Sequence, residues 1–427
     1  MSASTVSGSE KVPFWSNPAL GPLSSPMSVS QSRLSQDRLT RADRSRLGDW
    51  WWTLDKVSLL TILVLLVIGV VMSFAASPPI ARDLGLENEF YFVQKHLIFL
   101  IPTVGLVLGM SMLSSRTIVR VGLAVFALAI LGMIAALLFG AEVKGARRWI
   151  DFGFFQMQPS ELAKPALVVA SAWLFAEHAK RPELYTNLFA VGLFLITATV
   201  LIAQPDIGQT MLITAVWGSL FFVAGMSWLW IILLGAVAVG GIVAAYFFIP
   251  HVTSRIDRFL NPETGDTHQT DRAIESFVEG GWFGRGPGEG VVKEHLPDSH
   301  TDFLFAVMAE EFGIVICLIV LGLYAFLFAR CILTALRHED VFARYAIVGL
   351  VALLAMQAAI NMGVNLQLLP AKGMTLPFLS YGGSSLLSVG FTAGILLGLT
   401  RHKARIRQTR KGFGTNANRW QWSMQGG

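Results

Sequence analysis

Long apolar segments separated by short polar ones run through most of the chain. Each segment has roughly the 17–25 residues that a helix needs to cross a bilayer, and their repetition favours helical spans over a barrel. The expected spans are 57–77, 92–112, 117–139, 160–177, 187–203, 207–224, 228–250, 303–330, 345–367 and 377–400. The pattern therefore predicts an all-α polytopic membrane protein with about ten transmembrane helices.

Composition agrees with this class. Hydrophobic residues form 53% of the chain and charged residues only 14%, and the mean hydropathy is +0.57. A soluble globular protein has about 25% charged residues. The bilayer is therefore the expected main solvent, and we expect no nucleic-acid partner.

The basic residues indicate how the spans are oriented. Lys and Arg collect in cytoplasmic turns, and basic residues follow the second, fourth, eighth and tenth expected spans. The residues before the first span add Arg38, Arg41, Arg44 and Arg46 to the same side. Both termini are therefore expected in the cytoplasm.

Three regions are expected along the chain. Residues 1–49 are rich in Ser, Pro, Gly and Arg without apolar periodicity, which predicts a disordered cytoplasmic tail and not a signal peptide. Residues 50–402 form the expected transmembrane domain, with a large extracytoplasmic loop at 251–302. Residues 403–427 form a basic cytoplasmic tail that suits an anchor on anionic lipids.

A second outside loop, at about 140–159, is basic against the orientation rule. It carries Lys144, Arg147 and Arg148. One interpretation is pairing with Glu142, Asp151 or lipid headgroups. The other is an anion site for a diphosphate-carrying substrate, because Arg forks match phosphate oxygens. Both remain open.

The strongest candidate for chemistry lies where the large loop runs into an apolar segment. Asp302 stands at the lip of the expected span 303–330, and Glu310 and Glu311 lie two turns deeper. Ionisable groups at membrane depth usually mark a pathway or a reaction site. Asp302 also suits a helix N-cap, and His300 and Thr301 suit caps or surface positions.

Three further ionisable residues lie in or beside other spans. Glu161 and Lys164 are three residues apart on one expected helix face, which favours a structural ion pair. Asp206 follows a proline at an outer boundary, where it supplies a carboxylate or only a tight turn.

Near the end of the chain, prolines and glycines surround Lys372, which predicts a bent re-entry at the outer face. Ser384 and Ser385 follow, beside Gly382 and Gly383. Small residues of this kind allow close helix packing.

The glycine-dense stretch 280–290 has neither the Gly-Lys-Ser/Thr nor the preceding strand of a nucleotide loop. We therefore expect flexible turns beside a substrate cleft. No dedicated cluster of metal ligands is visible in the sequence.

Together these segments resemble the SEDS family, the shape, elongation, division and sporulation polymerases of bacterial cell walls. The matching motifs are Lys-Gly-Ala-x-Arg-Trp-Ile at 144–150, Gln-Pro-Ser-Glu-Leu-x-Lys at 158–164, Ala-Gln-Pro-Asp-x-Gly at 203–208, Leu-Pro-x-x-His-Thr-Asp-Phe at 296–303 and Pro-x-Lys-Gly-x-Thr-Leu-Pro-x-x-Ser-Tyr-Gly-Gly-Ser-Ser at 370–385. The extended N-terminus and the Ser-Phe-Ala-Ala-Ser-Pro-Pro at 73–79 are similar to the division-type branch more than to the elongation-type branch.

The resemblance implies a peptidoglycan glycosyltransferase that polymerises lipid II and releases undecaprenyl diphosphate. Asp302 matches the family's essential carboxylate and is the implied general base, acting on the acceptor 4-hydroxyl in an inverting displacement. The leaving diphosphate needs cations, for which Arg148 and Lys372 rank first, followed by Lys144 and Arg147. The resemblance also implies Mg²⁺ or Mn²⁺ and no organic cofactor.

The implied setting is the bacterial inner membrane at the division septum. The implied partners are an FtsI-like class B penicillin-binding protein, which crosslinks the strands, and other division proteins. Two other functions remain open from the sequence, a lipid II transporter and a non-catalytic scaffold. Buried polar residues such as Glu161, Lys164 and Asp206 suit a passage for a transported lipid.

Overall fold

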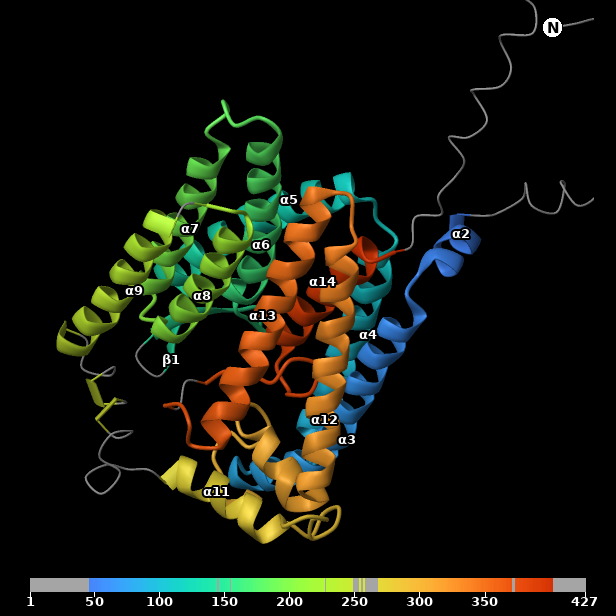
Figure 1. Ribbon diagram of the computed structural model, residues 1–427. Helices are drawn as coiled ribbons and strands as arrows, with labels where there is room; N and C mark the ends of the chain where they lie inside the picture. The colour runs from blue at the N-terminus through green and yellow to red at the C-terminus, as the bar shows by residue number, and fades with distance from the viewer. Residues whose placement is uncertain are drawn as a thin grey trace, which may run out of the picture. The chain divides into compact units, whose positions relative to one another are not determined.

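Helices form nearly all of the regular structure in the part of the chain that is described (Figure 1). The computed structural model describes residues 46–143, 146–153, 155–226, 228–248, 253–254, 256–257, 268–370 and 373–401. The elements are α2 (Arg46–Thr53), α3 (Lys56–Asp83), α4 (Tyr91–Ser111), α5 (Ser115–Phe139), β1 (Ala141–Val143), β2 (Ala146–Asp151), β3 (Gln156–Met157), α6 (Pro159–Lys180), α7 (Thr186–Ala203), α8 (Ile207–Val223), α9 (Trp228–Phe248), α11 (His268–Gly280), the 3₁₀ helix η2 (Val292–His295), α12 (Leu304–Leu336), α13 (Val341–Asn365) and α14 (Gly383–Leu399).

The chain divides into two units, Met1–Trp52 and Thr53–Gly427. In the first unit, Arg46–Trp52 already belong to helix α2, so the expectation of an unstructured tail up to residue 49 is wrong for its last four residues. Residues 1–45 and the tail 403–427 lie outside the described residues. The second unit contains the transmembrane region.

Each expected span contains a helix, and the all-α fold class is confirmed. Within the described residues, six helices are long and apolar enough to cross a membrane, namely α3, α4, α5, α7, α12 and α13. The full number of about ten spans stays a prediction. Three boundaries differ by six residues. Helix α3 ends at Asp83 and not at 77, and α12 ends at Leu336 and not at 330. The last helix begins at Gly383 and not at 377, because residues 373–382 form an irregular approach to it.

The start of α3 is fixed by a carboxylate. Asp55 is its N-cap and accepts hydrogen bonds from the backbone of Val57 (3.2 Å) and Ser58 (3.4 Å), which satisfies donors that a helix start leaves free. The guanidinium of Arg330 on α12 donates two hydrogen bonds to the same carboxylate, from Nε at 2.7 Å and from Nη2 at 2.8 Å. This end of α3 is therefore tied to α12.

Glycines of helix α14 allow it to pack closely against α4. A Cβ on Gly390 would lie 2.7 Å from the Thr103 side chain, and one on Gly394 would lie 2.6 Å from the Leu106 carbonyl oxygen. Side chains at these positions would hold the helices apart. The expected close packing of small residues after 382 is thus present, and it continues along the helix.

Helix α12 is broken near its start, where Gly313 has a φ of 80° and a ψ of 172°. The break leaves backbone groups without partners inside the helix, and the glycine-dense stretch 280–290 supplies them. Arg285 and Gly286 donate to the carbonyls of Glu310 (2.9 Å) and Glu311 (3.0 Å). Across the break, Ile314 and Val315 donate to the carbonyls of Gly281 (3.0 Å) and Trp282 (3.2 Å).

The glycines of this stretch are required by that contact. A Cβ on Gly280 or Gly284 would fall on the carbonyl oxygen of Ala309 or Glu311, well inside van der Waals contact. The expectation of flexible turns at 280–290 is therefore wrong: the segment is packed against α12 backbone to backbone. In Figure 1 the yellow helix α11 and the loop after it cross the end of α12.

Two carboxylates lock the same loop. Glu310 accepts hydrogen bonds from the backbone of Val291 (2.5 Å), Val292 (2.7 Å) and Lys293 (2.9 Å). Glu311 forms a buried ion pair with the ammonium of Lys293, which also donates to the Ala75 carbonyl on α3 at 3.4 Å. Glu310 and Glu311 thus hold the described end of the large loop to the membrane helices.

The expected loop at 140–159 contains a small antiparallel sheet, in the order β1-β2-β3. Ile150 of β2 pairs with Met157 of β3, and Gln156 and Gln158 border the turn into α6. Sequence periodicity over such short strands is too weak to reveal them. The sheet places the chain before α6 beside the start of α14.

We expect Gly280→Ala to destabilise the protein by about 1–3 kcal/mol, because the added methyl group meets the Ala309 carbonyl and forces the backbones apart. Gly322→Ala, further along α12 with no atom within 4 Å of the new Cβ, is the matched control and should be neutral or stabilising by up to about 1 kcal/mol. Thermal unfolding of the detergent-solubilised variants measures both. Equal melting temperatures would contradict the packing role of Gly280.

Candidate active site

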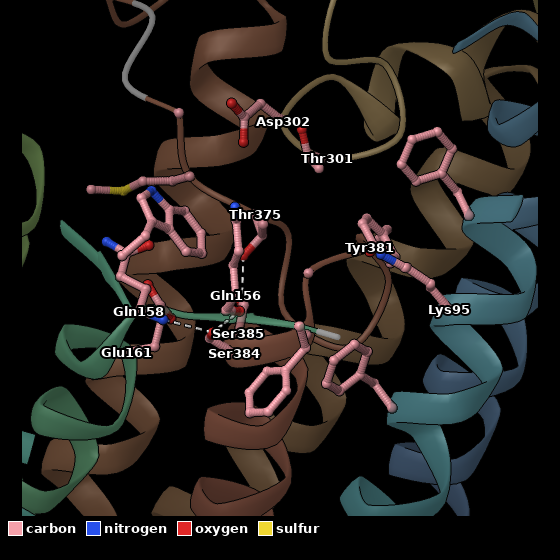
Figure 2. Close-up of a pocket in the computed structure, with 18 of the residues that line it drawn as sticks. Lys95, Gln156, Gln158, Glu161, Thr301, Asp302, Thr375, Tyr381, Ser384 and Ser385 are labelled. Carbon is pink, nitrogen blue, oxygen red and sulfur yellow. Dashed lines mark hydrogen bonds between the residues drawn. The ribbon is translucent and has the colours of Figure 1, made fainter. Parts of the chain in front are cut away.

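A cavity of about 740 Å³ lies between α4, α6, α14 and the segments that precede α12 and α14 (Figure 2). Aromatic side chains line part of it, and amides, hydroxyls and carboxylates line the rest. Of the residues predicted as site residues, the described ones in its lining are Thr301, Asp302, Glu161, Ser384 and Ser385. Segments far apart in sequence therefore meet around one space.

The backbone of Asp302 is held firmly. Its carbonyl accepts hydrogen bonds from the side-chain amides of Asn361 (2.8 Å) and Asn365 (3.0 Å) on α13. Its N–H donates to the Asp298 carbonyl at 3.1 Å. The N-cap of α12 is Phe303, so the interpretation of Asp302 as the cap is wrong. Its carboxylate lines the cavity instead.

The irregular segment before α14 comes close to that carboxylate. Gly373 has a φ of 68°, and a Cβ there would lie 3.3 Å from Oδ2 of Asp302. Asn361 donates to the Met374 carbonyl at 2.6 Å as well as to Asp302, so one amide orders both segments. The described chain is irregular on both sides of Lys372, at 366–370 and 373–382. Lys372 itself lies outside the described residues, and the re-entry expected around it stays a prediction.

His300 lies behind the cavity and not in its described lining. Its ring is 4.5 Å from that of Phe92 and 5.6 Å from that of Tyr381, between centroids, and its carbonyl accepts from the Tyr381 backbone at 3.1 Å. Burial lowers the pKa of His300 to about 4. The neutral imidazole thus packs between two rings and supports the loop that carries Thr301.

The inner end of the cavity is a network of buried polar groups. Lys164 donates to Glu161 at 2.8 Å and to Gln209 at 3.0 Å, and Gln209 donates to Glu161 at 3.2 Å. The expected ion pair of Glu161 and Lys164 is present, with the lysine side chain only 1% exposed. Paired charges of this kind can stay ionised in a buried site.

Asp206 joins the same region to the sheet. It caps α8 by accepting from the Gln209 backbone at 3.4 Å, and its carboxylate lies 3.5 Å from Arg148. Burial raises the pKa of Asp206, and the Arg148 charge opposes that rise. Arg148 also donates to the Pro205 carbonyl at 3.1 Å.

Both described arginines of the basic loop therefore have carboxylate partners. Arg147 lies 3.6 Å from Glu142, one of the pairings that the sequence suggested, whereas the contact of Arg148 with Asp206 was not anticipated. Lys144 lies outside the described residues. Two of the four cations expected for the diphosphate thus face protein carboxylates.

The two serines at the start of α14 are hydrogen bonded. Ser384 accepts from the Gln158 backbone at 2.8 Å, and the hydroxyls of Ser385 and Thr375 lie 2.6 Å apart. Figure 2 shows these bonds at the bottom of the cavity. The serines join three segments of its wall.

Sequence reasoning missed Lys95. It lines the cavity from α4, its ammonium lying 4.6 Å from the centre of the Tyr91 ring. The signal was available, because Lys95 is an ionisable residue inside the expected span 92–112 and such residues are usually functional. It went unnoticed because the expected cations were sought only in loops.

The buried imidazole of His300 makes stability depend on pH. Its pKa is about 4 in the folded protein and about 6.5 when unfolded, so between these values the unfolded chain binds more protons. Stability should therefore fall by about 1–2 kcal/mol as the pH is lowered from 7.5 to 5. Thermal unfolding across this range should show a shallower pH dependence for His300→Gln than for wild type. An unchanged slope in His300→Gln would disprove this assignment.

Comparison with known proteins now identifies the family. The family model of FtsW, RodA and SpoVE, described as cell cycle proteins, matches residues 56–405. A relative from Caulobacter vibrioides, named a probable peptidoglycan glycosyltransferase FtsW, is 45% identical over 85% of this chain and 93% of its own length. A relative of the same name from Acinetobacter baylyi is 34% identical over 84% of this chain and 92% of its own.

Solved structures support the same family. The rod shape determining protein RodA of Thermus thermophilus is 25% identical, with a TM-score of 0.61 over 83% of this chain and 99% of that one. A chain from a study of the coordination of polymerization and crosslinking by a peptidoglycan synthase complex is 26% identical, with a TM-score of 0.68 over 82% of this chain and 98% of that one. Because the family model, the relatives and the fold all cover the whole helical region, this chain belongs to the FtsW/RodA/SpoVE family of cell cycle proteins, the SEDS family.

Proposed function

We propose that this protein is a peptidoglycan glycosyltransferase that polymerises lipid II into glycan strands during septal wall synthesis. The observation that carries the proposal is the position of Asp302. Its main chain is anchored by two asparagines, and its carboxylate borders a cavity large enough for sugar units. The names of the FtsW relatives support both the activity and the division role.

In the proposed reaction Asp302 removes the proton from the 4-hydroxyl of the acceptor sugar. The hydroxyl oxygen forms a bond to the anomeric carbon of the donor while the bond from that carbon to the diphosphate breaks. The electron pair leaves with undecaprenyl diphosphate, and the proton stays on the Asp302 carboxyl. One displacement of this kind inverts the anomeric centre.

One carboxylate is sufficient for this chemistry. Glycosidases pair a base with an acid because their leaving alcohol must be protonated, whereas a diphosphate leaves as a stable anion. Glu161, a further cavity carboxylate at the inner end, is already bound by Lys164 and Gln209. It is therefore proposed to keep the cavity wall in place and not to move protons.

The dependence on Mg²⁺ or Mn²⁺ stays a prediction. Within the part of the chain that the structure describes, no group of three His, Cys, Asp or Glu side chains could hold a metal. Mg²⁺ is often bound by one or two carboxylates together with substrate phosphates. We assign no metal ligand among the described residues and derive no step through an ion.

A transporter of lipid II is the less supported alternative. The transporter hypothesis requires Glu161, Lys164 and Asp206 to be polar groups along a passage for the lipid. These groups are at most 6% exposed and are joined to one another and to Gln209 and Gln158 by hydrogen bonds. Opening a passage there would break a satisfied buried network, at a cost of several kcal/mol.

The protein is a multi-pass membrane protein, and we propose the septum of the inner membrane as its site of action. We also propose a class B penicillin-binding protein as its partner. One similar structure is described as coordinating polymerization and crosslinking within a synthase complex, which supports a partner that crosslinks the strands. Contacts with other division proteins are part of the same proposal.

Asp302→Asn should abolish glycan polymerisation, because the amide has nearly the same shape and cannot accept the proton. We expect a loss of at least about 100-fold, in the range of a missing general base. Purified protein incubated with lipid II, with the glycan products separated on a gel, measures this. Polymer from Asp302→Asn at the wild-type rate would rule out the base.

Asp298→Asn is the matched control. It makes the same chemical change four residues away, at a residue outside the described cavity lining with a φ of 55°, a conformation that Asn tolerates well. It should retain activity within about threefold. Lipid II movement across vesicles without any polymer from wild type would favour the transporter.

Addition of a purified FtsI-like transpeptidase should raise polymerisation by the wild-type protein. The same addition should leave Asp302→Asn inactive, because the partner supplies no replacement for the base. A titration of the partner at fixed lipid II measures the effect. No increase at saturating, co-purified partner would contradict the proposed partnership.

A further inference from the structure

Lys95 is the only cation among the described residues that line the cavity. It projects from the first turns of α4, and Figure 2 shows it beside Tyr381, away from Asp302 in the segment that precedes α12. The carboxylate and the ammonium thus enter the same space from different segments.

No ion pair between Lys95 and a carboxylate is present among the described residues. Within the described part of the chain, its one recorded interaction is with the Tyr91 ring, at 4.6 Å. The neighbouring described cations differ, since Arg148 lies against Asp206, Arg147 against Glu142 and Lys164 against Glu161. Of these neighbouring described cations, Lys95 is therefore the one most available to an anionic ligand in the cavity.

The stereochemistry of an inverting displacement says where such a ligand would lie. The attacking oxygen and the leaving oxygen stand on opposite faces of the anomeric carbon. A base that serves the attacking oxygen and a cation that receives the leaving group must then lie on different sides of the donor sugar. Asp302 and Lys95 are arranged in this way across the cavity.

The surface near Lys95 suits a polyprenyl chain. Leu84 and Leu86, in the turn between α3 and α4, line the same cavity, as do Phe92 and Phe99 of α4. A diphosphate held at Lys95 would have apolar surface beside it for the first isoprene units. The opposite wall, with Gln158 and Ser384, is polar and suits sugar hydroxyls.

We propose that Lys95 binds the diphosphate of the polyprenyl donor and stabilises it as it leaves, so that the α4 side of the cavity is the donor side and the Asp302 side is the acceptor side. This assignment rests on the proposed polymerase function and adds to it the orientation of the two lipid substrates. It makes Lys95 a substrate-binding residue, in addition to the loop cations considered from the sequence.

The test measures binding of undecaprenyl diphosphate to the full chain in detergent. Lys95→Met, which keeps the length of the side chain and removes its charge, should weaken binding by roughly 10- to 100-fold, the usual range for losing a charge-assisted hydrogen bond. Lys95→Arg should restore binding to within about threefold. Lys95→Gln gives the same comparison with a polar neutral side chain and guards against misfolding of the Met variant.

Arg272→Met is the matched control, because it removes a cation from α11 that pairs with Glu275 and does not line the cavity. It should bind as wild type does. Phosphatidylglycerol at the same mole fraction should not displace the probe, which separates a diphosphate site from general attraction to anionic lipids. In polymerisation, kcat/KM of Lys95→Met should fall by the same factor as its affinity.

Asp302→Asn separates this proposal from the function on which it rests. It should lose polymerisation and keep its affinity for undecaprenyl diphosphate within about twofold. Unchanged affinity in Lys95→Met and Lys95→Gln would overturn the assignment of Lys95, whatever the polymerisation assay gives. Displacement of the probe by phosphatidylglycerol would overturn it as well. Wild-type protein that binds the diphosphate through Lys95 without making polymer would instead refute the polymerase.

Discussion

The break in α12 at Gly313 is the constraint on which the outer half of the structure depends. Backbone groups left unpaired at membrane depth cost several kcal/mol each, so the break requires another segment to supply hydrogen bonds. The glycine-dense stretch does this with four backbone bonds, on both sides of Gly313. The loop that leads to Asp302 is in this way joined to the helix that follows it.

The same principle governs the buried charges. Glu310 accepts from three backbone N–H groups, Glu311 pairs with Lys293, and Glu161 accepts from Lys164 and Gln209. Each of these three carboxylates holds neighbouring segments of the fold together. Asp302 and Lys95 both line the cavity, and the asparagines of α13 fix the main chain of Asp302.

Much of the fold follows from the sequence because it depends on a single local property. Apolar segments of the right length gave the positions of the helices from α3 to α14, and the three-residue spacing of Glu161 and Lys164 gave their pairing. The predictions that were wrong or missing concern contacts between segments that are distant in the sequence. The glycines at 280–290 are explained by carbonyls of α12, and the partner of Arg148 comes from residue 206. Asp302 satisfies the sequence rule for an N-cap, yet Phe303 takes that position, since the asparagines of α13 bind the Asp302 carbonyl.

The asparagines have one more consequence. They hold Asp302 by its main chain, and exchanging its carboxylate for an amide leaves those two hydrogen bonds in place. A chemically silent form that keeps this anchor therefore needs only a single exchange of oxygen for nitrogen. Such a form would keep both lipids in place without consuming them, which is what is needed to capture the complex before the sugars join.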